Sequence, residues 1–224
     1  MSRAVQRDAL TQVLRDVRSA AQRGQQLLVV VDIDDTVANG RLRLRTAART
    51  AGLRAKRLTS GEDLYAGLDA RTRSTRQDAF RKLYFDDPAL ARLDSAQRGA
   101  RAFLRAVQRA GGRVLYVSGR YESTRKVTLA YLRRLRLPLA HPRDLMLNAD
   151  EERTAVDWKR TARAEIARRG RIAALFDNEP ETAADYKVAF PGAHVFRLAT
   201  FRFQEAPAER PKGVWVVRDF SLAH

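Results

Sequence analysis

The chain has 224 residues, 45% of them hydrophobic and 8% aromatic, which suffices for one large domain with an ordinary buried core. The absence of cysteine excludes disulfides, thiolate-bound metals and cysteine nucleophiles, and three histidines leave little for a histidine-rich metal site. The formal net charge of +17 makes nucleic acid a possible partner, although the preference for Arg over Lys can also follow from genome composition alone.

Short, continuous apolar runs recur along the chain and predict buried strands of a parallel sheet. They lie at residues 27–31, 113–117, 144–147, 172–176 and 194–198, with a further edge strand expected at 213–217. Helix-prone stretches are expected from the N-terminus to near residue 24 and at about 97–110, 122–135, 154–169 and 180–190. Strands that alternate with helices indicate an α/β fold, here a Rossmann-like three-layer sandwich.

Residues 38–95 interrupt this alternation with a polar, charged and helix-prone segment. We expect a core made of residues 1–37 and 96–224, with a small helical insertion after the first strand that acts as a cap. Residues 39–60 hold seven basic residues and no acidic one: Arg41, Arg43, Arg45, Arg49, Arg54, Lys56 and Arg57. Such a one-sign stretch is either a solvated helix face or a surface that attracts an anionic substrate.

No apolar run approaches the roughly 20 residues of a membrane helix. The N-terminus also lacks the apolar core of a secretory signal. We therefore expect a soluble protein of the cytoplasm.

Polar side chains follow three of the predicted strands. They are Asp32-Ile33-Asp34-Asp35-Thr36, Ser118-Gly119-Arg120 and Asp177-Asn178-Glu179. Ligands of parallel sheets bind outside the carboxyl ends of the strands, so these side chains are expected to meet at one rim. Two carboxylates from one strand end and a third from another suit Mg²⁺, and a nearby hydroxyl and Lys can bind phosphoryl oxygens.

These motifs, taken in order, resemble those of the haloacid dehalogenase-like (HAD) phosphohydrolase superfamily over residues 27–200. The resemblance rests on LLVVVDIDDT, RVLYVS, AVDWKRTARAEI and IAALFDNEPE. It implies a Mg²⁺-dependent phosphomonoesterase in which Asp32 forms an aspartyl-phosphate and Asp34 acts as general acid and then base. It further implies that Mg²⁺ is held by Asp32, Asp177 and the backbone carbonyl of Asp34.

The resemblance also implies which residues bind the phosphate of the substrate. They are Thr36, Ser118, Gly119, Arg120 and Lys159. Lys126 competes with Lys159 for the role of the lysine that steadies the phosphoaspartate. For Arg120, the alternative is a structural salt bridge.

Three positions depart from the pattern of the family. Asp35 stands where many relatives have Gly, so it either caps the turn or contacts a metal-bound water. Asn178 replaces an acid next to Asp177. Glu181, four residues after Asp177, either supports the metal ligands from behind or is an acid in a first helical turn, where the helix dipole favours it.

The pattern is also similar to the phosphatase half of phage-type polynucleotide kinase-phosphatases, although the P-loop of a kinase half is absent from the sequence. The expected partner is therefore a phosphorylated substrate, either a small molecule or a nucleic-acid 3′-phosphate end. Two alternatives are a non-catalytic nucleic-acid-binding protein and a phospho-acceptor signalling module. The position of Asp32 on the first strand argues against the signalling module, which carries its phosphorylated Asp on a middle strand.

Overall fold

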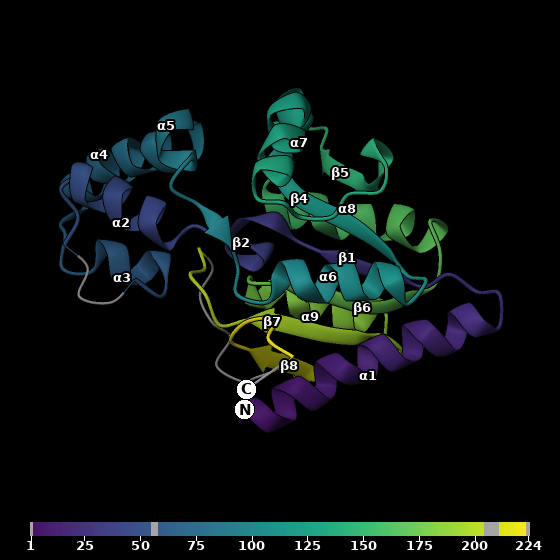
Figure 1. Ribbon diagram of the computed structural model, residues 1–224. Coiled ribbons are helices and arrows are strands. Elements are labelled where there is room, and N and C mark those ends of the chain that lie inside the picture. Colours follow the sequence, from purple (N-terminus) through teal and green to yellow (C-terminus); the bar gives the residue numbers. More distant parts are fainter. Residues whose placement is uncertain (1, 55–57, 204–210, 223–224) are drawn as a thin grey trace.

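The computed structural model describes residues 2–54, 58–203 and 211–222, and its centre is a parallel sheet of six strands (Figure 1). These strands are β1 (Leu28–Val31), β4 (Arg113–Tyr121), β5 (Leu145–Asn148), β6 (Ile172–Asp177), β7 (His194–Leu198) and β8 (Val214–Val217). Their order is β5-β4-β1-β6-β7-β8, and all five pairings between neighbours are parallel. All six predicted strands are confirmed. Because β1 has β4 on one side and β6 on the other, its carboxyl end is the topological switch point where ligands bind.

Helices cover both faces of the sheet, which confirms the three-layer sandwich. One face carries α1 (Arg3–Gln22), α6 (Ala100–Arg109) and α7 (Arg125–Arg134), and the other carries α8 (Ala155–Arg168) and α9 (Pro180–Ala189). Successive side chains of β1 alternate between the two layers: Val29 and Val31 pack with the first, Leu28 and Val30 with the second. None of the helices in the described ranges is long and apolar enough to span a bilayer.

The local sequence explains where the helices begin. The hydroxyl oxygen of Ser2 accepts a hydrogen bond from the backbone N–H of Val5 at the start of α1, at 3.3 Å. The hydroxyl oxygen of Thr154 accepts one from Asp157 at the start of α8. Pro180 is the first residue of α9. Its missing N–H costs nothing there, because the N–H of a first helical residue has no partner within the helix.

After β1 the chain leaves the sheet and forms a mainly helical segment before it returns to β4. Its two ends pair antiparallel as β2 (Ala38–Asn39) and β3 (Ser95–Ala96), which brings the exit and the return of the chain together. Between them lie α2 (Arg41–Thr50), α3 (Gly61–Tyr65), α4 (Ala70–Arg81) and α5 (Pro88–Ala91). These helices bury a hydrophobic cluster of their own and stand at the side of the molecule where β1 ends (Figure 1).

The basic stretch of the insertion does not act as one surface. Arg43 is only 3% exposed and packs inward, whereas Arg41, Arg45 and Arg49 lie exposed on α2, as does Arg54 just beyond it. Lys56 and Arg57 fall outside the described residues. The interpretation as a solvated helix face is therefore wrong for Arg43, and the partners of this residue belong to the site described next.

Candidate active site

A lysine joins two aspartates at the carboxyl ends of neighbouring strands. The Nζ atom of Lys159, on α8, lies 2.8 Å from Oδ1 of Asp32 and 2.7 Å from Oδ2 of Asp177. The pairing of Val31 with Phe176 puts the two aspartates level with each other, one residue beyond that pair. All three side chains are buried. Lys126 lies exposed on α7, so the fold brings Lys159 rather than Lys126 to the aspartates.

This cluster holds two carboxylates and one ammonium group. Burial raises the pKa of Asp32 and of Asp177, and the charge of Lys159 only partly offsets that rise. Burial lowers the pKa of Lys159, but the two carboxylates outweigh burial and hold this pKa well above its usual value. A protonated Lys159 balances only one of the two carboxylates, so the cluster favours a further cation.

The donor atoms at this position fit Mg²⁺. In proteins Mg²⁺ is usually held by one or two carboxylates and keeps several waters, and Asp32 and Asp177 provide the two carboxylates. The backbone carbonyl of Asp34 is the third oxygen that the family resemblance implies. No group of three or more His, Cys, Asp or Glu side chains that could hold a metal occurs among the described residues. A cation here would therefore depend on the two carboxylates, the backbone and water.

Asp34 is held by two arginines. Arg120 binds it with two parallel hydrogen bonds, from Nε at 2.7 Å and from Nη2 at 2.8 Å. Arg43 reaches it from α2, with Nη2 2.8 Å from Oδ1. Burial raises the pKa of Asp34, but the charges and hydrogen bonds of Arg120 and Arg43 outweigh it and hold this pKa well below its usual range. Asp34 is therefore ionised in this arrangement and can donate a proton only after the arginines release it.

The two arginines are themselves fixed by aromatic rings and a second carboxylate. The guanidinium carbon of Arg43 lies 4.3 Å from the ring centre of Tyr84, and that of Arg120 lies 4.2 Å from the ring centre of Tyr131. Asp94 accepts a hydrogen bond from the hydroxyl of Tyr131 at 2.6 Å and pairs with Arg43 at 3.1 Å. Sequence reasoning missed Tyr84, Asp94 and Tyr131, because no motif marks them.

Asp35 joins the loop after β1 to the insertion. Its φ of 54° lies in the left-handed region, where glycine is the least strained residue. The hydroxyl of Tyr84 donates to Oδ2 of Asp35 at 2.5 Å, and the backbone N–H of Gly40 donates to Oδ1 at 3.3 Å. Burial raises the pKa of Asp35 to about 7, although the hydrogen bond from Tyr84 acts to lower this pKa. Of the two roles considered for Asp35, these contacts favour that of capping the turn.

Tyr84→Phe is expected to lower the free energy of unfolding by about 1.5–3 kcal/mol, because it removes a buried hydrogen bond to a carboxyl group. Tyr116→Phe is the matched control: its hydroxyl donates to the carbonyl of Pro138 at 2.7 Å. A neutral acceptor predicts a smaller loss, about 0.5–1.5 kcal/mol. Urea unfolding of both variants measures the difference. Equal losses in the free energy of unfolding would show that the hydrogen bond from Tyr84 to Asp35 stabilises the protein no more than one to a neutral carbonyl.

The Ser-Gly-Arg motif lies within β4 instead of after it, since this strand continues through Tyr121. The pairing with β5 shifts register between Ser118 and Tyr121, so the motif forms an irregular end of the strand. Ser118 is buried, and its Oγ accepts a hydrogen bond from the backbone N–H of Arg120 at 3.3 Å. A Cβ atom on Gly119 would lie 2.3 Å from the Cβ of Ala155, the first residue of α8. Glycine is therefore required where β4 meets the helix that carries Lys159.

Gly119→Ala is expected to lower the free energy of unfolding by about 1–3 kcal/mol through overpacking. It should also slow catalysis, because Lys159 lies one helical turn beyond the displaced Ala155. The control is Gly192→Ala, since no heavy atom lies within 4 Å of an added Cβ there. Urea unfolding and initial rates of both variants test this. A Gly119→Ala protein that matches Gly192→Ala in both would refute the close approach.

The remaining predicted residues divide between the site and the surface. The hydroxyl of Thr36 donates to Oδ1 of Asn178 at 3.3 Å, and Nδ2 of Asn178 donates to the carbonyl of Phe201 at 2.7 Å. Thr36 and Asn178 thus tie the loop after β1 to the loop after β6. Glu181 lies exposed in the first turn of α9 and pairs with Arg160 at 2.7 Å. This position favours the helix-terminal interpretation of Glu181.

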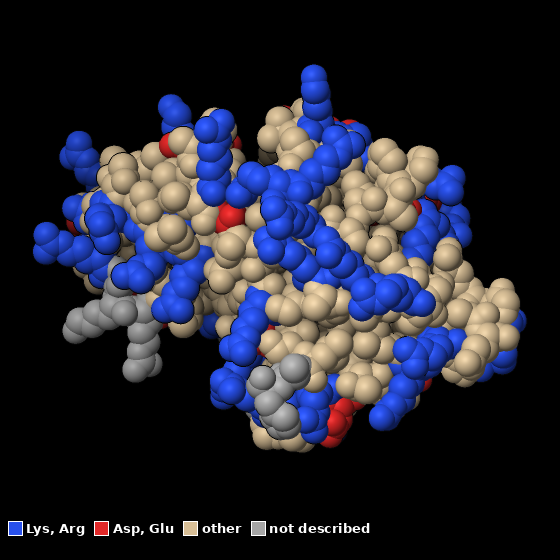
Figure 2. All heavy atoms as spheres, viewed as in Figure 1, with Lys and Arg blue, Asp and Glu red and all other residues tan. Residues whose placement is uncertain are grey.

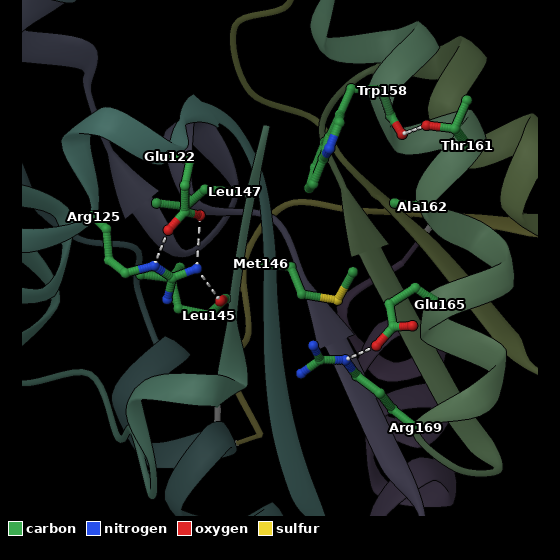
Figure 3. Close-up of a pocket in the computed structure, with 10 residues that line it drawn as sticks. All are labelled: Glu122, Arg125, Leu145, Met146, Leu147, Trp158, Thr161, Ala162, Glu165 and Arg169. Atoms are coloured by element: carbon green, nitrogen blue, oxygen red, sulfur yellow. Dashed lines mark hydrogen bonds and ion pairs between the residues drawn. The ribbon is translucent and has the colours of Figure 1, made fainter. Parts of the chain in front are cut away.

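A separate pocket of about 300 Å³ lies between β5 and α8 (Figure 3). Trp158 and Met146 line its apolar part. Arg125 closes one side, where Nη2 binds Glu122 at 2.8 Å and the carbonyl of Leu145 at 3.0 Å. None of the predicted site residues lines this pocket. Trp158, which stands next to Lys159 in sequence, therefore lines this pocket and packs in the core on the α8 side of the sheet.

Comparison with known families matches residues 70–179 to the family model described as HAD superfamily, subfamily IIIB (acid phosphatase). The matched range includes Ser118, Gly119, Arg120, Lys159 and Asp177, and it begins downstream of Asp32. No curated protein matches the sequence.

Several solved structures share the fold at low sequence identity. The HAD-like hydrolase SP0104 from Streptococcus pneumoniae has 11% identity and a TM-score of 0.55, with 80% of this chain and 88% of that chain covered. Protein tyrosine kinase A from Mycobacterium tuberculosis has 16% identity and a TM-score of 0.58, with 86% and 93% covered. A predicted phosphatase from Clostridium acetobutylicum has 12% identity and a TM-score of 0.53, with 80% and 94% covered. At these identities the likeness concerns the fold alone.

The family match supports a hydrolase of phosphoric monoesters. The similarity is to acid phosphatases of the HAD superfamily, subfamily IIIB, and the matched residues 70–179 make up just under half of the chain. The comparisons give no support to a phospho-acceptor module or to a non-catalytic binding protein.

Proposed function

We propose that the protein is a Mg²⁺-dependent phosphomonoesterase that works through an aspartyl-phosphate on Asp32. The observation that carries this proposal is the buried bridge of Lys159 between Asp32 and Asp177. Lys159 occupies Oδ1 of Asp32, and no described residue donates a hydrogen bond to the other oxygen, Oδ2. One carboxylate oxygen is thus fixed by a cation, while the other is left to act as the nucleophile.

In the first step, Oδ2 of Asp32 attacks phosphorus, and the bond between phosphorus and the ester oxygen breaks. The ester oxygen leaves with a proton from Asp34, which takes up that proton from solvent once the substrate has drawn Arg120 away. In the second step, water attacks the phosphorus of the phosphoaspartate, phosphate leaves, and the carboxylate of Asp32 is restored. Asp34 takes the proton of that water, so its own protonation state is also restored.

Asp34 can follow this cycle only if the hold of the two arginines is reversible. Phosphoryl oxygens of an incoming substrate compete with Asp34 for the planar guanidinium of Arg120, which suits both kinds of anion. Loss of Arg120 from Asp34 would raise the pKa of this carboxyl and prepare it to carry a proton. Substrate binding and activation of Asp34 are in this way the same event.

Asp32, Asp177 and the backbone carbonyl of Asp34 would hold Mg²⁺, which supplies positive charge against the carboxylates and the phosphoryl oxygens. Ser118, Gly119 and Lys159 are the proposed phosphate-binding positions of the core, together with Thr36. Residues 38–95 are the proposed cap over a core of residues 1–37 and 96–224. The cap reaches the proposed catalytic loop (residues 32–36) through Arg43, which pairs with Asp34, and through Tyr84, which donates to Asp35.

The proposal predicts that phosphate release depends on Mg²⁺. Chelation should reduce the rate by about two orders of magnitude or more, since a bound cation stabilises the transition state by several kcal/mol. Added Mg²⁺ should restore it. The measurement is phosphate release from para-nitrophenyl phosphate, sugar phosphates and nucleotide monophosphates. A rate of phosphate release that the chelator does not change, or no release from any ester, would contradict the proposal.

A further inference from the structure

The helices α6 and α7 carry basic charge without acidic residues. Residues 95–121 contain six Arg and no Asp or Glu, and residues 123–143 contain six Arg or Lys and no Asp or Glu. Figure 2 shows Lys and Arg side chains in a nearly continuous band over α7 and α6 on one face of the molecule. We call this surface the arginine band and define it by Arg101, Arg105 and Arg109 of α6 with Arg133 and Arg134 of α7.

The charge of the band is not neutralised within the protein. Arg105, Arg109 and Arg133 are exposed, and their side chains form no hydrogen bond or ion pair with any described residue. Arg101 donates to the carbonyl of Leu135 at 2.7 Å, and Arg134 donates to that of Ala91 at 2.9 Å. These acceptors are neutral, so both guanidinium groups keep their net charge. The band therefore presents five positive charges to solvent anions.

We propose that the arginine band binds the phosphate backbone of double-stranded nucleic acid. The three arginines of α6 follow one another every four residues, so they lie along one side of the helix over about 12 Å. A row of fixed cations of this length suits a polymer that carries a charge on every unit and releases its counterions on binding. Such contacts position a duplex without reading its sequence.

The other residues of α6 and α7 favour a duplex over a single strand or an anionic membrane as the partner of the band. Proteins that bind single strands stack bases on exposed aromatic rings, and the aromatic residues of these two helices, Phe103 and Tyr131, are buried. Helices that bind membrane surfaces insert an apolar face into the lipid, and the apolar faces of α6 and α7 are packed on the sheet. A duplex backbone, which requires neither feature, is the favoured partner.

The band and the active site share helix α7. The ring of Tyr131 on its buried side holds Arg120, which binds Asp34, while Arg133 lies on its exposed side. A duplex on the band would thus contact the same helix that supports the catalytic loop. We extend the proposal to the substrate: a terminal phosphate of a nucleic-acid duplex, an extension that rests on the proposed phosphatase activity.

Binding is tested without catalysis, on the wild-type protein in chelator, by fluorescence anisotropy of a labelled duplex oligonucleotide at several salt concentrations. The band predicts binding that weakens steeply with salt. The logarithm of the binding constant should fall with the logarithm of the salt concentration, with a slope of about 0.9 for each phosphate contacted. The double variant Arg105→Gln/Arg109→Gln should reduce this slope by about 2. The matched control is Arg168→Gln/Arg171→Gln, which removes the same charge from the end of α8 and from the residue before β6.

Three results would overturn the band as a duplex site. They are no binding at low salt, equal losses in the two double variants, and tighter binding to anionic vesicles or to a single strand than to the duplex. Equal losses would mean that net charge alone attracts the polymer.

The substrate is tested separately, by phosphate release from duplexes with a 3′- or a 5′-terminal phosphate, compared with para-nitrophenyl phosphate. We expect release from a duplex end to exceed that from the small ester, and the band double variant to remove the advantage. Salt-sensitive binding with no such advantage would refute the substrate while leaving the binding site intact. Loss of release from every ester would refute the phosphatase proposal instead.

Discussion

Asp32→Asn is expected to lower phosphate release by about four orders of magnitude or more, the scale on which removal of a nucleophile acts. The amide keeps the size and shape of the side chain but cannot attack phosphorus as a carboxylate does. Asp177 still pairs with Lys159 at 2.7 Å, so the fold around the site should persist. The measurement is the initial rate of the purified variant, with circular dichroism to confirm that it is folded.

The control for Asp32→Asn is Glu165→Gln, which changes an exposed helical ion pair with Arg168 and leaves the cluster untouched. It should keep the wild-type rate. Acid quenching during turnover provides a second readout, since wild-type protein should gain the mass of one phosphoryl group and the Asp32→Asn protein should not. A folded Asp32→Asn protein that retains the wild-type rate would exclude Asp32 as the nucleophile.

The sequence predicts the sheet well because each strand is a continuous apolar run that ends in polar residues. The approach of Asp32 to Asp177 is predictable for the same reason, since parallel strands end at one rim. Lys159 lies on α8 and is predicted only through the family resemblance. Contacts between the insertion and the core are not predictable in this way. Tyr84 contacts Asp35, and Asp94 contacts Arg43, after the chain has left β1 and before it returns through the pairing of β2 with β3.

The basic stretch shows what a charge count cannot tell. Arg41, Arg45 and Arg49 are spaced by four residues and share the exposed side of α2, while Arg43 lies on the side of Leu44, which packs in the core of the insertion. Helical phase thus separates a buried residue of the site from its solvated neighbours. The same spacing places the arginines of α6 on one exposed side. The density of basic residues along the sequence does not reveal this row, because its members are four residues apart.

Asp35 shows a different limit. The sequence predicts only that Asp35 departs from the glycine of the family pattern. In the structure Asp35 is a left-handed residue whose side chain accepts a hydrogen bond from Tyr84, 49 positions away. Backbone conformation at a single position depends on such distant contacts, which no local pattern encodes. A glycine would adopt this conformation with less strain, but only a carboxylate accepts the hydrogen bonds from Tyr84 and Gly40 that join this loop to residues 38–95.

Lys159→Met is expected to reduce activity about a hundredfold or more and to lower the free energy of unfolding by about 3–5 kcal/mol, because it leaves two buried carboxylates without their shared cation. Both carboxyl groups would then have their pKa raised further. A group whose pKa is higher in the folded than in the unfolded state stabilises the protein at low pH and loses that contribution as the pH rises through the folded pKa. The destabilisation should therefore be larger at alkaline than at mildly acidic pH.

Lys126→Met provides the matched control, since it removes the other candidate lysine from an exposed position on α7. It should keep the activity and the stability of the wild type. Urea unfolding with and without Mg²⁺ completes the test: a cation that binds Asp32 and Asp177 replaces part of the missing charge, so Mg²⁺ should stabilise Lys159→Met more than it stabilises the wild type. If Lys126→Met instead loses activity, or if Mg²⁺ stabilises both proteins equally, the two aspartates do not share Lys159 and a further cation in the way that the mechanism requires.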